Sequence, residues 1–300
     1  MAFKNLYIES NVHLSIKNEQ LIIKSEEEYT APLEDINSIC IDSLKTNISV
    51  YTLNKITEHD IILYICDEKH LPTSVLLGIN RYSRKLRNLN RQLNMPKPVL
   101  KRMWQGIVKQ KIENQAKVLQ VLGFDKEHKD LINMVEAVLS GDSTNIEARA
   151  AALYFKTLFG DNFTRRDDTF FYNSALNYGY AIIRGMISRS LVMYGFEPSL
   201  GIFHHNQLNA FNLSDDIIEC FRPLVDLYVY LNVEIKKELD SKSKKDIYNI
   251  INSMVLIDGK SYNAQTAIEN VVKSLATSFE KKENFIKLPE LNGLKEYRYA

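Results

Sequence analysis

Residues 201–223 read GIFHHNQLNAFNLSDDIIECFRP, and the rest of the chain can be organised around this stretch. It opens with a short loop that carries two adjacent histidines, His204 and His205. The run Asn-Leu-Ser then predicts the start of a helix, with Ser214 as its N-cap. The stretch therefore predicts imidazole side chains at the entrance of a helix.

Two carboxylates follow on the same predicted helix. Asp216 and Glu219 are three residues apart, so on a helix they share one face. Acidic residues in a first turn often only complement the helix dipole. This stretch alone therefore leaves two interpretations open, a metal site and an ordinary helix start.

A further carboxylate lies far upstream, in TNIEARAAALYF at residues 144–155. Thr144 as N-cap with Glu147 three residues later is the pattern of a capping box, which would give Glu147 a purely structural role. However, the alanine-rich helix that follows indicates close helix packing and partial burial of Glu147. Only Arg149 is a cation close by in sequence, and a buried carboxylate is costly unless it is paired or bound to a metal. We therefore expect a metal as its partner.

These donors together indicate the kind of metal. Glu147, one of the two histidines, and Glu219 with Asp216 nearby form a set rich in carboxylates. Such oxygen-rich ligation suits Mg²⁺ or Mn²⁺ better than a tetrahedral zinc site. The sequence thus predicts a Mg²⁺ or Mn²⁺ site built from distant segments.

Basic residues are concentrated between residues 69 and 112, where no Asp or Glu occurs. The whole chain holds 38 Lys and Arg against 37 Asp and Glu, so this segregation is not a matter of overall charge. Cations interleaved with amides predict a surface that contacts phosphates, with affinity that falls as salt rises. The alternative is a solvated basic hinge. The expected DNA contacts are Arg81, Arg84, Lys85, Arg87, Arg91 and, in a later basic loop, Arg165 and Arg166.

The pattern along the chain predicts an α+β fold with two domains. Residues 1–78 are β-rich, with strands at residues 6–8, 12–16, 21–23, 36–41 and 61–65 and one helix at residues 47–58. Residues 79–97 form the basic linker. Residues 98–300 are expected to be an all-α catalytic domain, including helices at residues 170–194, 246–256 and 264–279.

Composition limits the class of protein. A hydrophobic content of 45% and a charged content of 25% are typical of soluble globular proteins. No apolar run approaches the roughly 20 residues of a membrane span, and the first residues lack the pattern of a signal peptide. We expect a cytoplasmic protein that does not bind membranes. Its three cysteines are expected to be buried, reduced thiols.

A metal beside a basic groove favours attack on a phosphodiester without a covalent protein nucleophile. Three hypotheses remain open from the residues alone. The first is a metal-dependent DNA integrase and endonuclease, in which a DNA 3′-hydroxyl attacks. The second is a stand-alone nuclease for branched DNA, in which water attacks. The third is a non-catalytic DNA-binding scaffold, in which Glu147 only caps its helix.

The order of three motifs resembles one known family. Asn-x-Glu opens an alanine-rich helix that carries Tyr154, Gly-x-x-His spans residues 201–204, and Asp-x-x-Glu-x-Phe-Arg-Pro spans residues 216–223. This order is similar to the CRISPR-associated integrase that acquires new spacers. The run LNAFNLSDDIIECFRP resembles the version found in type II systems. The resemblance covers essentially the whole chain.

The resemblance implies the metal ligands. The family's glutamate, histidine and second acid fall on Glu147, His204 and Glu219. His204 is preferred because it stands three residues after the glycine of its motif, and His205 is the alternative one residue away. Asp216 matches a further acidic position near the metal.

The resemblance also implies partners and a reaction. It implies a homodimer formed largely through the β-rich domains, with two dimers flanking a dimer of a small second CRISPR adaptation protein. This assembly would hold a short DNA duplex and join its 3′-hydroxyl ends to the boundaries of a CRISPR repeat by transesterification. Other type II adaptation proteins are further expected partners.

Overall fold

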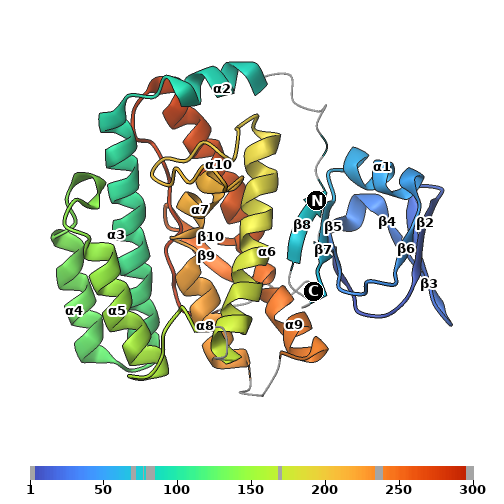
Figure 1. The fold of residues 1–300 in the computed structure, drawn as a ribbon, viewed down its shortest axis with the longest axis horizontal. Helices are drawn as coiled ribbons and strands as arrows, with labels where there is room; N and C mark the ends of the chain where they lie inside the picture. The colour runs from blue at the N-terminus through green and yellow to red at the C-terminus, as the bar shows by residue number, and fades with distance from the viewer. Residues whose placement is uncertain are drawn as a thin grey trace. The chain divides into compact units, whose positions relative to one another are not determined.

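The computed structural model describes residues 4–68, 72–76, 78, 85–167, 171–233 and 239–294 (Figure 1). The chain separates into two units, Met1–Arg81 and Tyr82–Ala300. The first unit is β-rich and the second is mostly helical, so the expected α+β class is confirmed.

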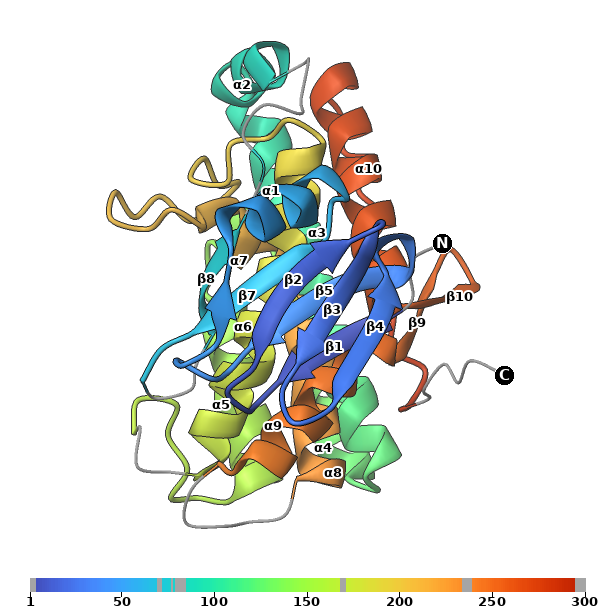
Figure 2. The ribbon, with the colours of Figure 1, turned by 90° about the vertical axis from the view of Figure 1, so that its right-hand side faces the viewer.

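Two four-stranded sheets pack face to face in the described part of the first unit (Figure 2). In one sheet three parallel strands are joined by an antiparallel fourth, in the order β1 (Lys4–Ile8), β5 (Ile36–Ile41), β7 (Ile62–Cys66) and β8 (Pro72–Leu76). The other sheet has the order β4 (Glu28–Pro32), β3 (Gln20–Lys24), β2 (His13–Lys17) and β6 (Asn47–Ile48). A 3₁₀ turn (Leu33–Asp35) precedes β5, and helix α1 (Val50–Glu58) follows β6.

The core of this unit lies between the sheets. Leu14 and Leu21 project from one sheet, Ile39 and Leu63 from the other, and Ile56 from α1; all five are fully buried. Each strand predicted from the sequence is present, whereas β4, β6 and β8 were not predicted. These three are edge strands or very short ones with at most one buried residue each, so they lack the apolar pattern that marks a strand.

The second unit is built around long helices. Helices α3, α4 and α5 lie side by side, as Figure 1 shows in green. The helices in chain order are α2 (Lys85–Leu93), α3 (Lys97–Val121), α4 (Asp125–Glu136), α5 (Ile146–Phe159), α6 (Phe171–Met193), α7 (Asn212–Ile218), α8 (Arg222–Asn232), α9 (Ser241–Tyr248) and α10 (Ala264–Lys281), with 3₁₀ turns at Ser140–Asp142 and Asn249–Asn252.

A β-hairpin interrupts the region that was expected to be entirely helical. Strands β9 (Met254–Ile257) and β10 (Lys260–Asn263) pair antiparallel, and β9 occupies the end of the helix predicted over residues 246–256, of which only residues 246–248 are α-helical, at the end of α9. The turn between them has positive φ at Asp258 (50°) and Gly259 (72°). An Asp-Gly pair between two short strand-forming runs is a strong hairpin signal, so this prediction was wrong although the sequence carried the necessary information.

Much of the predicted linker is helix α2, which belongs to the second unit. Its two buried side chains are amides. Asn88 Nδ2 donates to the carbonyl oxygen of Tyr194 at 2.5 Å. Gln92 Nε2 donates to the carbonyl oxygens of Glu197 (3.0 Å) and Leu200 (3.3 Å), and its Oε1 accepts the Glu197 N–H. These two amides therefore dock α2 onto the loop before the histidines and do not form part of a phosphate-contacting surface.

The three cysteines are buried thiols, as expected. Within the part of the chain that the structure describes, no helix combines the length and the apolar character needed to span a membrane.

Candidate functional site

Glu147 lies in the first turn of α5, but it does not cap that helix. The N-cap is Asn145, in a left-handed conformation (φ 52°). The carboxylate of Asp142 accepts the N–H groups of Ile146 (2.9 Å) and Glu147 (3.1 Å). The predicted capping box with Thr144 is therefore wrong, and the carboxylate of Glu147 does not take part in capping the helix.

Glu219 directly follows the last residue of α7 and is buried. Its Oε1 accepts a hydrogen bond from Arg222 Nε at 2.8 Å. Ser214 is not the N-cap of α7, because the helix begins two residues earlier; its hydroxyl lies 2.8 Å from that of Ser188, on α6. This contact fixes α7 against α6, and with it the position of Glu219.

Asp216 is fully buried and shapes the histidine loop. Its Oδ2 accepts the backbone N–H groups of Ile202 (2.5 Å) and Phe203 (3.1 Å), and its Oδ1 accepts that of His204 (3.1 Å). Oδ1 also lies 2.8 Å from His204 Nδ1. Asp216 and Glu219 therefore act differently: Asp216 holds the loop and the imidazole, and Glu219 contacts the cations Arg222 and Lys111.

The glycine that opens the loop is required by close packing. A Cβ atom on Gly201 would lie 2.2 Å from the carbonyl oxygen of His204 and 2.8 Å from Asp216 Oδ2. Both distances are shorter than van der Waals contact. The Gly-x-x-His spacing thus has a steric cause, because the loop folds back on its own glycine.

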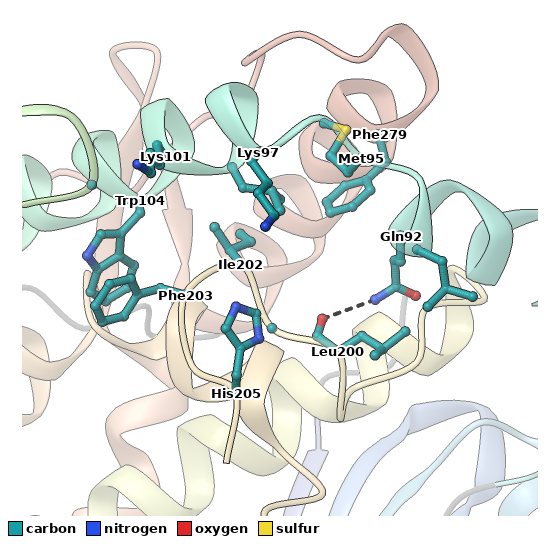
Figure 3. A pocket seen from close by; sticks show the side chains of 14 residues that line it. Gln92, Met95, Lys97, Lys101, Trp104, Leu200, Ile202, Phe203, His205 and Phe279 are labelled. Atoms are coloured by element: carbon teal, nitrogen blue, oxygen red, sulfur yellow. Dashed lines mark hydrogen bonds between the residues drawn. The ribbon is translucent and has the colours of Figure 1, made fainter. Parts of the chain in front are cut away.

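The two histidines have different surroundings. The His204 ring meets the edge of the buried Trp104 ring at 5.6 Å between centroids, and Phe203 stacks on Trp104 at 4.3 Å. His205 instead points into a neighbouring pocket of about 480 Å³ (Figure 3). The imidazole held by Asp216 is therefore that of His204.

This pocket lies between the end of α2, the start of α3 and the histidine loop. Figure 3 shows His205 in its middle, with the Trp104–Phe203 stack at one side and the Gln92–Leu200 hydrogen bond at the other. Its walls are mainly apolar, with Lys97 and Lys101 as the cations among the lining residues. It adjoins the candidate site through the histidine loop.

The central residue of the site is Lys111 on α3, which the sequence pattern did not reveal. Its Nζ lies 2.5 Å from Glu147 Oε1 and 2.5 Å from Glu219 Oε2. The two carboxylates, 72 residues apart in sequence, therefore meet at one cation. The absence of a nearby cation had favoured a metal for Glu147, but the cation comes from another helix. In the sequence, Lys111 is one of the basic residues between residues 69 and 112, and no local pattern distinguishes it from the others.

The electrostatics keep this cluster charged. Burial alone would raise the pKa of Glu219, but Arg222 and Lys111 outweigh burial and hold that pKa below its usual value. Burial would lower the pKa of Lys111, but Glu219 and Glu147 raise it overall, so the ammonium stays protonated. The hydrogen bond to Asp216 raises the pKa of His204, and burial opposes this.

The donor set fits a divalent cation in its chemistry. Glu147 and Glu219 already converge on a positive charge, and Glu219 Oε2 is buried without a well-aligned hydrogen bond from any described residue. When Asp216 accepts the Nδ1–H of His204, Nε2 carries the lone pair, as is usual for metal-binding histidines. Among the described residues, however, no three His, Cys, Asp or Glu side chains lie close enough to share one metal ion, so the structure brings Glu147 and Glu219 together but does not place His204 in one cluster with them.

The predicted DNA contacts fall into three groups. Arg81 and Arg84 lie outside the described residues. Arg87 and Arg166 are exposed. The other three contact neighbouring side chains: Lys85 Nζ lies 3.8 Å from Glu197, Arg91 donates to Glu280 at 2.8 Å, and Arg165 donates to Asn173 and Asn177.

Comparison with known proteins defines the family. The family model described as CRISPR associated protein Cas1 matches residues 6–246. A CRISPR-associated endonuclease Cas1 from Neisseria meningitidis serogroup C (strain 8013) is 41% identical over 304 residues, which cover 100% of both chains.

Solved structures share the fold. A casposase bound to an integration product matches with a TM-score of 0.77 and 19% identity, over 95% of this chain and 92% of that one. A chain of a Cas6-RT-Cas1–Cas2 complex matches with a TM-score of 0.73 and 19% identity, over 96% of this chain and 36% of that one. The family match and the full-length relative together show that this chain belongs to the Cas1 family of CRISPR-associated proteins.

Proposed function

We propose that this protein is a metal-dependent DNA integrase and endonuclease of CRISPR adaptation, which joins the 3′-hydroxyl ends of a short duplex to repeat boundaries by transesterification. The observation that carries the proposal is the convergence of Glu147 and Glu219 on one cation, 2.5 Å from each, together with an imidazole that is held by Asp216 and whose pKa is also raised by the charge of Glu219. The endonuclease name of the Neisseria relative and the fold shared with a casposase bound to an integration product support it.

The residues have distinct roles in this proposal. Glu147, His204 and Glu219 would hold Mg²⁺ or Mn²⁺. Such an ion, when bound, polarises the phosphoryl oxygen and neutralises charge on the leaving oxygen. Asp216 orients the His204 ring through Nδ1, and Arg222 fixes one oxygen of Glu219.

The partners in this proposal follow from the basic residues and from the fold neighbours. Arg87 and Arg166 are exposed and would contact the DNA backbone. One fold neighbour is a chain of a Cas6-RT-Cas1–Cas2 complex, which supports a small second CRISPR adaptation protein as partner; the homodimer is part of the proposal. Double-stranded DNA, as short duplex and as repeat, would be the substrate.

A strand-transfer assay tests the proposal. A duplex with labelled 3′-hydroxyl ends is incubated with a plasmid that carries the repeat, Mg²⁺ or Mn²⁺, and the small second adaptation protein. The wild type should yield joined products, whereas E147A, H204A and E219A should yield none and still bind the duplex. E136A, at an exposed position on α4, is the control that should retain activity. Joined products from E219A would overturn the site assignment.

The same assay tests the first alternative, and calorimetry with Mn²⁺ tests the second. A stand-alone nuclease for branched DNA would release cleaved strands without joined products, because water would be the attacker. A non-catalytic scaffold would bind DNA and show no Mn²⁺ binding that depends on Glu147. The carboxylate of Asp142, rather than that of Glu147, accepts the first backbone N–H groups of α5, and this observation argues against a capping role for Glu147.

A further inference from the structure

The charges at the site already balance without a metal. Glu147 and Glu219 supply two negative charges, and Lys111 and Arg222 supply two positive ones. The side chain of Lys111 is only 8% exposed, so solvent screens these charges weakly. The charges of these four side chains therefore cancel. A divalent cation would add a net charge of +2.

The ammonium also competes for space with a metal. A Mg²⁺ ion binds carboxylate oxygens at about 2.1 Å. An ion held by both Glu147 Oε1 and Glu219 Oε2 would therefore overlap with Lys111 Nζ, which lies 2.5 Å from the same two oxygens. The metal and the ammonium cannot both occupy this position.

Lysine is suited to leave this position. Its ammonium is a compact point charge on a flexible stem, unlike the rigid fork of arginine. Its Nζ donates a hydrogen bond to Glu147 Oε1, whereas its contact with Glu219 Oε2 lacks hydrogen-bond alignment and is held mainly by charge. A DNA phosphate at the site would offer the ammonium another anion and would offset the charge of an incoming metal.

We propose that Lys111 is a built-in counter-cation, which holds Glu147 and Glu219 together in the metal-free protein and is displaced when a divalent cation and the DNA backbone bind. Resting on the function proposed above, this makes metal binding and DNA binding mutually reinforcing. The coupling is reciprocal: DNA raises the affinity for the metal by the same factor as the metal raises the affinity for DNA. The protein alone is then a weak metal binder.

Mn²⁺ binding to the full-length protein tests this by electron paramagnetic resonance of free Mn²⁺, with and without a 3′-hydroxyl duplex. K111M removes the charge and keeps most of the side-chain volume. K117M is the matched control, since Lys117 lies on the same helix and donates to Gln120 at the surface. We expect K111M to bind Mn²⁺ at least tenfold more tightly than the wild type and K117M when no DNA is present.

The duplex provides a second readout. It should tighten Mn²⁺ binding several-fold in the wild type and clearly less in K111M, whose carboxylates are already free. The melting temperature is a third readout: adding Mn²⁺ should raise it more in K111M than in the wild type. K111Q takes the place of K111M if the latter does not fold.

Two failures can be told apart. If Mn²⁺ binding depends on Glu147 but is equally tight in the wild type and K111M, the displacement of Lys111 is wrong and the proposed function stands. If K111M/E147A binds Mn²⁺ as well as K111M does, with or without duplex, the metal site itself is wrong. Weaker Mn²⁺ binding by K111M than by the wild type would also overturn the inference.

Discussion

Gly201 lies where the backbone passes the carbonyl oxygen of His204 and the carboxylate of Asp216. G201A should therefore cost about 1–3 kcal/mol of unfolding free energy, because the added methyl group has no space, and should impair strand transfer. Urea unfolding measures the first effect. The control is G106A on α3, whose Cβ would meet nothing closer than 3.8 Å and should stabilise the helix by about 1 kcal/mol. Equal stability of G201A and the wild type would contradict the steric account.

Asp216 sets the protonation of His204 in the metal-free protein. Its hydrogen bond raises the pKa of His204, so D216N should lower that pKa toward the ordinary value. Titration of the imidazole C–H signals by NMR measures this, and D125N, at an exposed position in the first turn of α4, is the control. A His204 pKa that is the same in D216N and the wild type would show that the contact does not hold the imidazole.

Asp226 gives a pH dependence of stability. It is buried on α8 with a hydrogen bond from Tyr180, and burial raises its pKa from 3.8 to about 6. The folded state favours the protonated form of Asp226. The contribution of Asp226 to the free energy of unfolding is therefore fully present below pH 4 and is lost as pH rises through 6. At 1.36 kcal/mol per pKa unit the loss is about 3 kcal/mol.

D226N removes that titration. Its unfolding free energy relative to the wild type should increase by up to about 3 kcal/mol between pH 4 and pH 8. Urea unfolding of both proteins across this range measures the difference. A difference that does not change with pH would mean that Asp226 does not titrate in the folded protein between these values.

At the scale of elements, helix α2 carries two kinds of polar residue that alternate in the sequence: amides that dock the helix and a cation that faces solvent. Asn88 and Gln92 dock the helix, whereas Arg87 is exposed. R87A/R166A should weaken duplex binding and reduce the slope of log affinity against log salt by about 2, with an unchanged melting temperature. Q92A should lower the melting temperature and leave that slope unchanged. Fluorescence anisotropy across a salt series checks both, and an unchanged slope in R87A/R166A would exclude these arginines as phosphate contacts.

The elements also show what a sequence can predict. Strands β2, β3, β5 and β7 and helices α6 and α10 follow from apolar periodicity and were located closely. The hairpin β9–β10 was missed although Asp258 and Gly259 mark its turn. The edge strand β8 has no comparable turn signal or apolar alternation in its sequence.

The residues of the candidate site also fall into those that the sequence could predict and those that it could not. Glu147, His204 and Glu219 could be singled out because their motifs are local in sequence. Lys111 could not, because its burial between α5 and the end of α7 is a consequence of tertiary packing. The roles of Asp142 and Asp216 as backbone acceptors depend likewise on loop conformations that no periodicity specifies.

At the scale of the whole molecule, the account predicts a homodimer formed through the β-rich unit. Val50 and Tyr51, at the start of α1, are 81% and 59% exposed although both are apolar or aromatic. V50E/Y51E should shift the protein from dimer to monomer in size-exclusion chromatography with light scattering. A control with K24E on β3 should remain dimeric. A V50E/Y51E protein that keeps the mass of two chains would place the dimer contact elsewhere.

The most direct test of the central claim is the position of Mn²⁺ in a crystal of the protein with its 3′-hydroxyl duplex, located by anomalous scattering. The account predicts a peak within coordination distance of Glu147, His204 Nε2 and Glu219, with Lys111 Nζ moved away from both carboxylates. A well-occupied peak elsewhere, with Lys111 still between Glu147 and Glu219, would contradict it.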